Sequence, residues 1–171
     1  MKAWYINCNS FNPKILAMQT LISPGQTRRQ RYVATKLNLL YDVMQESKRG
    51  YEKIASTSTD RNYQRALNSL ALECGQYANE LYNQICSLGE HPMPEKKADR
   101  YIWNQVSLSV KKQDDILHIC NGSERIIMKA YQEVLNDPSV VNPLRGTINY
   151  QLNGIKYAFV KVKLLNTTLA Y

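Results

Sequence analysis

Apolar residues recur at alternating steps of three and four in four separate segments of this 171-residue chain. That spacing places them on one face of an α-helix. The segments cover roughly residues 35–55, 61–88, 113–135 and 142–169, and no alternating β-pattern of useful length accompanies them. A chain of this length fits one domain with a buried core. The sequence therefore predicts an all-α protein built as a four-helix bundle.

The connections between these segments predict the order of the helices. Short polar loops follow the first and third helices, whereas residues 89–112 form a long connection with a short helical piece near 99–110. One long crossover between helices 2 and 3 is the connectivity of ferritin-like folds, with helix directions up-down-down-up. Residues 1–34 show no sustained period. We interpret them as an N-terminal arm, irregular or partly helical, before a bundle domain of residues 35–169.

Parts of the central region resemble a known family. Residues 39–51 resemble the first-helix pattern of an uncharacterised bacterial ferritin-like family, a domain of unknown function, and residues 72–81 resemble its second-helix pattern. Trp103 and residues 122–131 complete the resemblance, which covers about residues 36–165. It implies a ferritin-like, self-associating bundle with no assigned activity.

A di-iron site of the ferritin-like type is not expected. Such sites need inward carboxylates from all four helices and a histidine from two of them. Residues 138–171 contain no Asp, Glu or His, so the last helix cannot supply its share. By their angle around the first helix, Asp42 and Glu46 are expected to face solvent. We therefore predict no cofactor and no catalytic residue; the remaining candidates for a single divalent metal are Glu73, Glu124 and Glu46.

Polar residues at inward positions predict a hydrogen-bonded cluster in place of the metals. Glu124 and Gln151 lie nearest the centres of their apolar faces, and Glu73 lies at the border of its own. Buried polar atoms need partners, which tyrosine hydroxyls supply. The hypothetical buried polar cluster comprises Glu73, Glu124, Gln151, Tyr77 and Tyr131.

Cysteines and hydropathy indicate the compartment. No two of the four cysteines are spaced as Cys-x-x-Cys, and three of them lie in helical patterns. Free, buried thiols in a reducing compartment are the expected state. No apolar run approaches the ~20 residues that cross a bilayer. We expect a cytoplasmic protein without a membrane partner.

The net charge of +8 belongs to the two ends of the chain. Arg28, Arg29 and Arg31 lie near one end, and Lys156, Lys161 and Lys163 near the other. Basic ends of this kind are usually solvated, and weak nucleic-acid binding is the alternative. Two aromatic residues of the arm, Trp4 and Phe11, are the candidate anchors for a dimer or for a protein partner.

Together these features favour a non-catalytic, self-associating interaction or stress-related scaffold, with a dimer as the favoured oligomer. Two alternatives stay open: a degenerate ferritin-like protein that holds one divalent metal, and a weak nucleic-acid binder. The sequence does not identify a protein partner.

Overall fold

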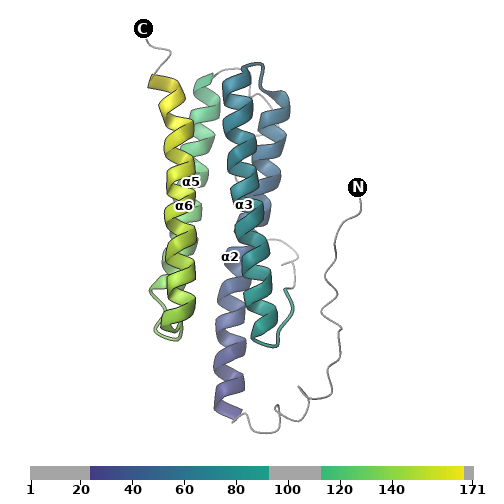
Figure 1. The fold of residues 1–171 in the computed structure, drawn as a ribbon, viewed down its shortest axis with the longest axis vertical. Helices are drawn as coiled ribbons and strands as arrows, with labels where there is room; N and C mark the ends of the chain where they lie inside the picture. The colour runs from purple at the N-terminus through teal and green to yellow at the C-terminus, as the bar shows by residue number, and fades with distance from the viewer. Residues whose placement is uncertain (1–23, 93–112, 168–171) are drawn as a thin grey trace.

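Four long helices form a bundle in the computed structural model, which describes residues 24–92 and 113–167 (Figure 1). The helices are α2 (Pro24–Thr57), α3 (Arg61–Ser87), α5 (Gln113–Leu135) and α6 (Asn142–Thr167). The predicted all-α four-helix bundle is confirmed. The predictions for Trp4, Phe11, Trp103 and the short helical piece near 99–110 lie outside the described residues.

Each helix packs against two neighbours. Helix α2 contacts α3 and α5, and α6 contacts the same two helices. In Figure 1, α2 and α6 run towards one end of the bundle, and α3 and α5 run towards the other. Helix α3 ends beside the start of α2, where Arg31 on α2 forms an ion pair with Glu90 at 3.1 Å. Helix α5 begins at the opposite end of the bundle.

The start of α2 differs from the prediction. The helix begins at Pro24 rather than at Thr35, so the predicted boundary was wrong. Its first turns are largely exposed, and the buried face begins only at Val33 and Ala34. Apolar periodicity cannot detect turns that precede the buried face. Proline suits the first position of a helix, because its missing N–H would have no partner there.

Hydrogen bonds tie these early turns of α2 to the α5–α6 loop. The Tyr32 hydroxyl donates to Asp137 at 2.9 Å, and Arg29 donates to the Ser139 carbonyl at 3.1 Å. The guanidinium of Arg145 donates to three carbonyl oxygens of the same loop and the end of α5: those of Leu135, Asp137 and Val140. The loop is thereby fixed by both α2 and α6.

Helix α3 covers the predicted range, residues 61–88, to within one residue. The Asp60 side chain caps its first turn, accepting from the backbone N–H groups of Asn62 and Tyr63 at 2.7 and 3.2 Å. Gly89 follows the helix at φ 81°, a left-handed conformation that glycine adopts without steric cost.

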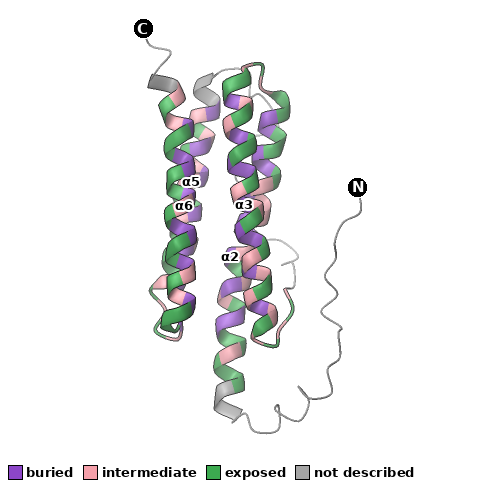
Figure 2. Ribbon diagram, viewed as in Figure 1, coloured by how far each residue is buried: buried purple, intermediate pink, exposed green. Residues whose placement is uncertain are grey.

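The core runs the length of the bundle, on the faces that the helices turn towards one another (Figure 2). Tyr51, Tyr63, Tyr131 and Phe159 are its largest fully buried side chains. The rings of Tyr51 and Phe159 meet edge to face, with centroids 6.2 Å apart and planes at 77°. Aromatic pairs favour this geometry because the positive ring edge meets the negative ring face.

Asp42 corrects one expectation about α2. It is 7% exposed, whereas the angular argument placed it in solvent. Asp42 lies opposite the apolar stripe of α2 and is nevertheless buried, so α2 is covered on more than the face that its apolar residues mark. Asn38, one turn earlier, donates to its carboxylate at 3.5 Å.

None of the described helices combines the length and the apolar character that crossing a bilayer requires.

Candidate functional site

Polar side chains of α3 and α6 meet at the contact between these two helices. Gln151 on α6 is fully buried, and its amide nitrogen donates to Oε2 of Glu80 on α3 at 2.8 Å. The other oxygen of Glu80 accepts from Gln76 at 3.1 Å. Both oxygens of this carboxylate are therefore engaged by amide groups. The sequence placed Gln151 at an inward position but did not assign Glu80 to the cluster.

Tyr77 lies in the same interface, one turn before Glu80. Burial is the main reason why the pKa of its hydroxyl is raised, and a hydrogen bond with Glu73 and the charge of that carboxylate add to the effect. The hydroxyl rests against Gly154 of α6, where a Cβ atom would overlap it. An alanine at this position would force the Tyr77 side chain to shift, because the α6 backbone lies directly against its hydroxyl.

Two buried polar atoms in this region have no hydrogen-bond partner within the described part of the chain: the Tyr131 hydroxyl and Oε1 of Gln151. Burial raises the pKa of Tyr131, and the nearby Cys74, Tyr77 and Glu80 raise it further. An unpartnered buried polar group costs about 1–3 kcal/mol. The interior polar region is thus only partly satisfied.

Glu124 does not join these groups. Its carboxylate pairs with Nζ of Lys163 at 2.5 Å, across the α5–α6 interface. Positions 151 and 163 lie about 18 Å apart along α6, at 1.5 Å per residue. The structure therefore places Glu73, Tyr77, Tyr131 and Gln151 in one region and Glu124 nearer the other end of the bundle.

A second, neutral hydrogen-bonded group connects α2 and α5. The Tyr51 hydroxyl donates to Oγ of Ser123 at 2.7 Å, and Ser123 donates to the Cys120 carbonyl at 3.0 Å. Burial is the first cause of the raised pKa of Tyr51, which keeps its hydroxyl protonated. Ser123 was not among the residues that the sequence placed in a buried polar cluster.

Cys74 and Cys120 are free and buried, as the sequence predicted. Burial raises the pKa of Cys120 to about 12 and also raises that of Cys74. Both thiols are therefore protonated at neutral pH. The thiolate is the nucleophilic form, so these two positions are unsuited to covalent catalysis.

The carboxylates named as metal candidates occur separately. Glu46 pairs with Arg49 on the surface of α2 at 3.1 Å, while Glu73 and Glu124 have the partners given above. His91 and His118 are exposed. Over residues 24–92 and 113–167, no three His, Cys, Asp or Glu side chains come together in a way that would hold a metal ion.

The basic residues near the start of the chain belong to a helix. Arg28, Arg29 and Arg31 lie on the exposed first turns of α2. Arg29 binds the α5–α6 loop and Arg31 pairs with Glu90, as described above. Two of the three guanidinium groups are therefore engaged in contacts that hold the bundle together.

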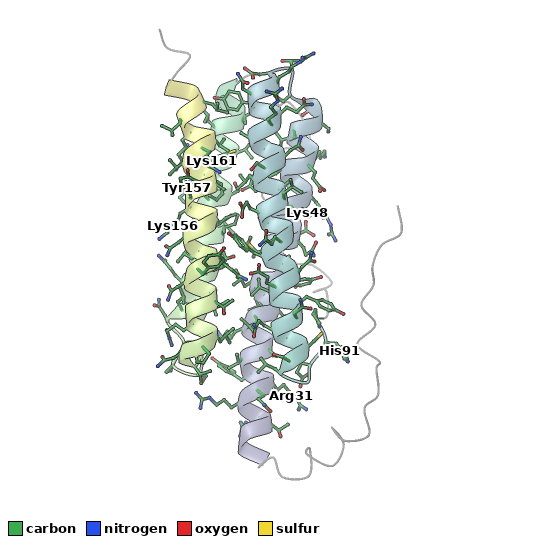
Figure 3. All side chains as sticks on the ribbon, viewed as in Figure 1. Arg31, Lys48, His91, Lys156, Tyr157 and Lys161 are labelled. Atoms are coloured by element: carbon green, nitrogen blue, oxygen red, sulfur yellow. The ribbon has the colours of Figure 1, made fainter. Side chains whose placement is uncertain are left out.

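Sequence reasoning missed the outer face of α6. Four large apolar or aromatic residues there are exposed: Tyr150, Tyr157, Val160 and Leu164. In Figure 3, Lys156, Tyr157 and Lys161 lie close together on the surface of α6, and Lys161 is on the side that faces α3. The spacing of 150, 157, 160 and 164 is itself helical. The sequence could have indicated this outer face, because these residues form a second apolar line that is separate from the one that predicts the core.

Comparison with known proteins does not identify a family for this chain. No protein-family model matches the chain, and no curated protein matches it. The resemblance to a ferritin-like family stays a prediction from the sequence.

Proposed function

We propose that this protein is a non-catalytic four-helix scaffold of ferritin-like topology, which acts through its surface and uses its interior for stability alone. The observation that carries the proposal is the pairing of the two partly buried carboxylates that contact α6. Glu80 is held by the amides of Gln76 and Gln151, and Glu124 is held by Lys163. A metal ion at either position would have to displace these groups.

The geometry of the carboxylates supports the same proposal. Di-iron bundles direct their carboxylates at one centre from facing helices. Here the two interhelical carboxylate contacts use α6 positions about 18 Å apart, and the α6 partners are an amide and an ammonium group. Helix α6 has no carboxylate that could join those of the other helices at one metal centre.

The arrangement of the helices supports the topology. Neighbouring helices run antiparallel, and α3 ends at the opposite end of the bundle from the start of α5 (Figure 1). The chain between α3 and α5 must therefore cross the length of the bundle. One such long crossover is typical of the ferritin-like connectivity. The proposal also includes self-association, with a dimer as the expected state.

One observation favours the alternative of a single divalent cation. The carboxylate of Glu80 lies near two buried oxygens that have no hydrogen-bond partner among residues 24–92 and 113–167, the Tyr131 hydroxyl and Oε1 of Gln151. Oxygen-rich sites suit hard cations such as Mg²⁺ and Mn²⁺. The site has one carboxylate that is already hydrogen-bonded twice, so we rank it below the scaffold.

Elemental analysis tests the proposal. The protein is produced in medium with added iron and manganese, purified without chelator, and its mass is measured by light scattering in the same run. The scaffold proposal predicts substoichiometric metal in a defined oligomer, with a melting temperature unaffected by EDTA. Stoichiometric iron or manganese would overturn it. The variants Glu80→Gln and Glu124→Gln would then show which carboxylate holds the ion.

A further inference from the structure

Four exposed aromatic or aliphatic residues lie along one side of α6. Tyr150, Tyr157, Val160 and Leu164 are 66%, 64%, 47% and 56% exposed. Steps of seven, three and four residues place them along one side of the helix. The core residues Ile148, Ile155 and Phe159 occupy the opposite side. We call the line of four exposed residues the outer stripe. Contiguous exposed apolar surface of this kind marks interaction sites.

The charges around the outer stripe have one sign. Every charged residue of α6 is a cation: Arg145, Lys156, Lys161 and Lys163. Arg145 is engaged by the α5–α6 loop, and Lys163 by Glu124. Lys156 and Lys161 are exposed, and no ion pair found among the described residues includes either of them. Lys161 lies over the ring of Tyr157, 4.6 Å from its centroid.

A groove between α3 and α6 adjoins the outer stripe. Its volume is about 280 Å³, and its polar lining comprises Asn62, Arg65 and Ser69 of α3 together with Lys161 of α6. The remaining lining side chains are alanine and leucine, and the lining contains no acid. The groove therefore offers two cations and two neutral hydrogen-bonding side chains beside an apolar floor, an arrangement that suits a carboxylate on an apolar stem.

We propose that the outer stripe and this groove bind an acidic amphipathic helix of another protein. Its apolar side chains would cover Tyr150, Tyr157, Val160 and Leu164. Its Glu and Asp residues would lie beside Lys156 on one edge and beside Lys161 and Arg65 on the other. Charges that flank an apolar seam select the partner in paired helices. The inference rests on the proposed function, because a scaffold that acts through its surface needs such a site.

Two other occupants fit less well. In a second copy docked α6 against α6, the flanking charges are again lysines, and like charges across an interface disfavour it. In a nucleic acid, bases stack on aromatic rings, so Val160 and Leu164 would gain no stacking contact. An apolar helix face covers aromatic and aliphatic side chains alike, as helix-in-groove recognition does.

A synthetic helical peptide tests the inference by fluorescence anisotropy. The probe is a labelled peptide with leucine at the seam positions and glutamate at the flanking positions; the matched control peptide carries lysine in place of glutamate. We expect the glutamate peptide to bind and the lysine peptide not to. Raising the salt from low to well above physiological concentration should weaken binding by about tenfold, because the charge pairs are exposed.

Protein variants locate the site. The double variant Lys156→Glu/Lys161→Glu should weaken binding of the glutamate peptide by at least about tenfold. It should also bind the lysine peptide, which the parent protein does not. Tyr157→Ser/Leu164→Ser should weaken binding of the glutamate peptide. The controls Lys53→Glu and Leu39→Ser change exposed residues of α2 and should leave binding unchanged. Circular dichroism establishes that each variant is folded.

Three results would overturn the inference: no binding of the glutamate peptide, equal binding of both peptides, or full binding by the charge-reversed variant. Binding of a single-stranded oligonucleotide or of phosphatidylserine vesicles, lost in the same charge-reversed variant while the peptide does not bind, would assign the face to that ligand instead. The metal content of the same preparation separates the two proposals. If the protein is metal-free and does not bind the glutamate peptide, only this inference is contradicted. If it contains stoichiometric iron, the proposed function is contradicted.

Discussion

The two faces of α6 are both apolar, yet their surroundings differ. The inner face carries Ile148, Ile155 and Phe159, which are fully buried, and its polar residue Gln151 has a specific partner in Glu80. The outer face carries aromatic and aliphatic side chains that are about half to two-thirds exposed, and beside them lie Lys156 and Lys161, which are exposed as well. A single helix therefore contains the pattern for two packing surfaces, of which the bundle uses one.

This difference shows what apolar periodicity establishes and what it leaves open. The period of 3.6 identifies a helix and one buried face. It does not say how many sides of the helix are covered. Asp42 lies off the apolar face of α2 and is buried, whereas Tyr157 belongs to an apolar line on α6 and is exposed. The charges give the missing information, because a solvated interaction face keeps its lysines and a core does not.

The largest effect should separate the two faces directly. Phe159→Ala removes a fully buried ring that packs against Tyr51 and should lower the free energy of unfolding by about 3–5 kcal/mol. Tyr157→Ala on the outer face should change it by no more than about 0.5 kcal/mol. Urea unfolding followed by circular dichroism measures both. Similar losses for the two variants would mean that the outer face is covered in the free protein.

Two glycines of α6 sharpen the comparison. A Cβ at Gly154 would overlap the Tyr77 hydroxyl, whereas a Cβ at Gly146 meets nothing within 4 Å. Gly154→Ala should therefore cost about 1–3 kcal/mol through overpacking. Gly146→Ala should stabilise by up to about 1 kcal/mol, because alanine is the better helix former. Thermal unfolding of the pair checks this, and a stabilised Gly154→Ala would refute the close approach of α3 and α6.

A smaller effect should distinguish the hydroxyls that face the inner side of the bundle. Tyr51→Phe breaks the hydrogen bond to Ser123 and should cost about 1 kcal/mol. Tyr131→Phe removes a hydroxyl without a partner in the described structure and should be nearly neutral or slightly stabilising. The measurement is the difference in urea midpoint at a common slope. A larger loss for Tyr131→Phe would show that its hydroxyl is satisfied.

The smallest effect concerns the loop before α6. Burial alone would raise the pKa of Asp137, but hydrogen bonds from the Ser139 N–H and the Tyr32 hydroxyl outweigh it and lower the pKa below its ordinary value of 3.8. The ionised form is thus favoured by folding, so its contribution is present above pH 3.8 and is lost as the pH falls through the folded value.

The variant Asp137→Asn checks this pH dependence. It should melt slightly below the parent protein at neutral pH, and the difference should shrink as the pH falls below 3.8. Melting curves between neutral and strongly acidic pH give the comparison. A difference that stays constant over this range would place the stabilising charge elsewhere.

Much of the fold could be predicted from the sequence, because the four apolar faces, the Asp60 cap and Gly89 are local signals. The start of α2 could not be, because its first turns are stabilised by contacts with the distant residues Asp137 and Ser139 rather than by an apolar face. Such long-range hydrogen bonds have no signature in local spacing.

The candidate polar site was predicted in part. The inward position of Gln151 follows from its angle on the helix. Its partner Glu80 could not be found in this way, because that pairing depends on how α3 and α6 are rotated against each other. The same holds for Glu124, whose ion pair with Lys163 requires the register between α5 and α6.

The most direct test of the central claim, that α6 has an exposed second packing face, is to map peptide binding by NMR on the ¹⁵N-labelled 171-residue chain. Titration with the glutamate-flanked helical peptide should shift the amide signals of α6 near Tyr150, Tyr157 and Leu164 and those of α3 near Arg65. The signals of residues at the α2–α5 contact, such as Tyr51 and Ser123, should stay in place. Shifts confined to α2 and α5, or no shifts at all, would contradict the account.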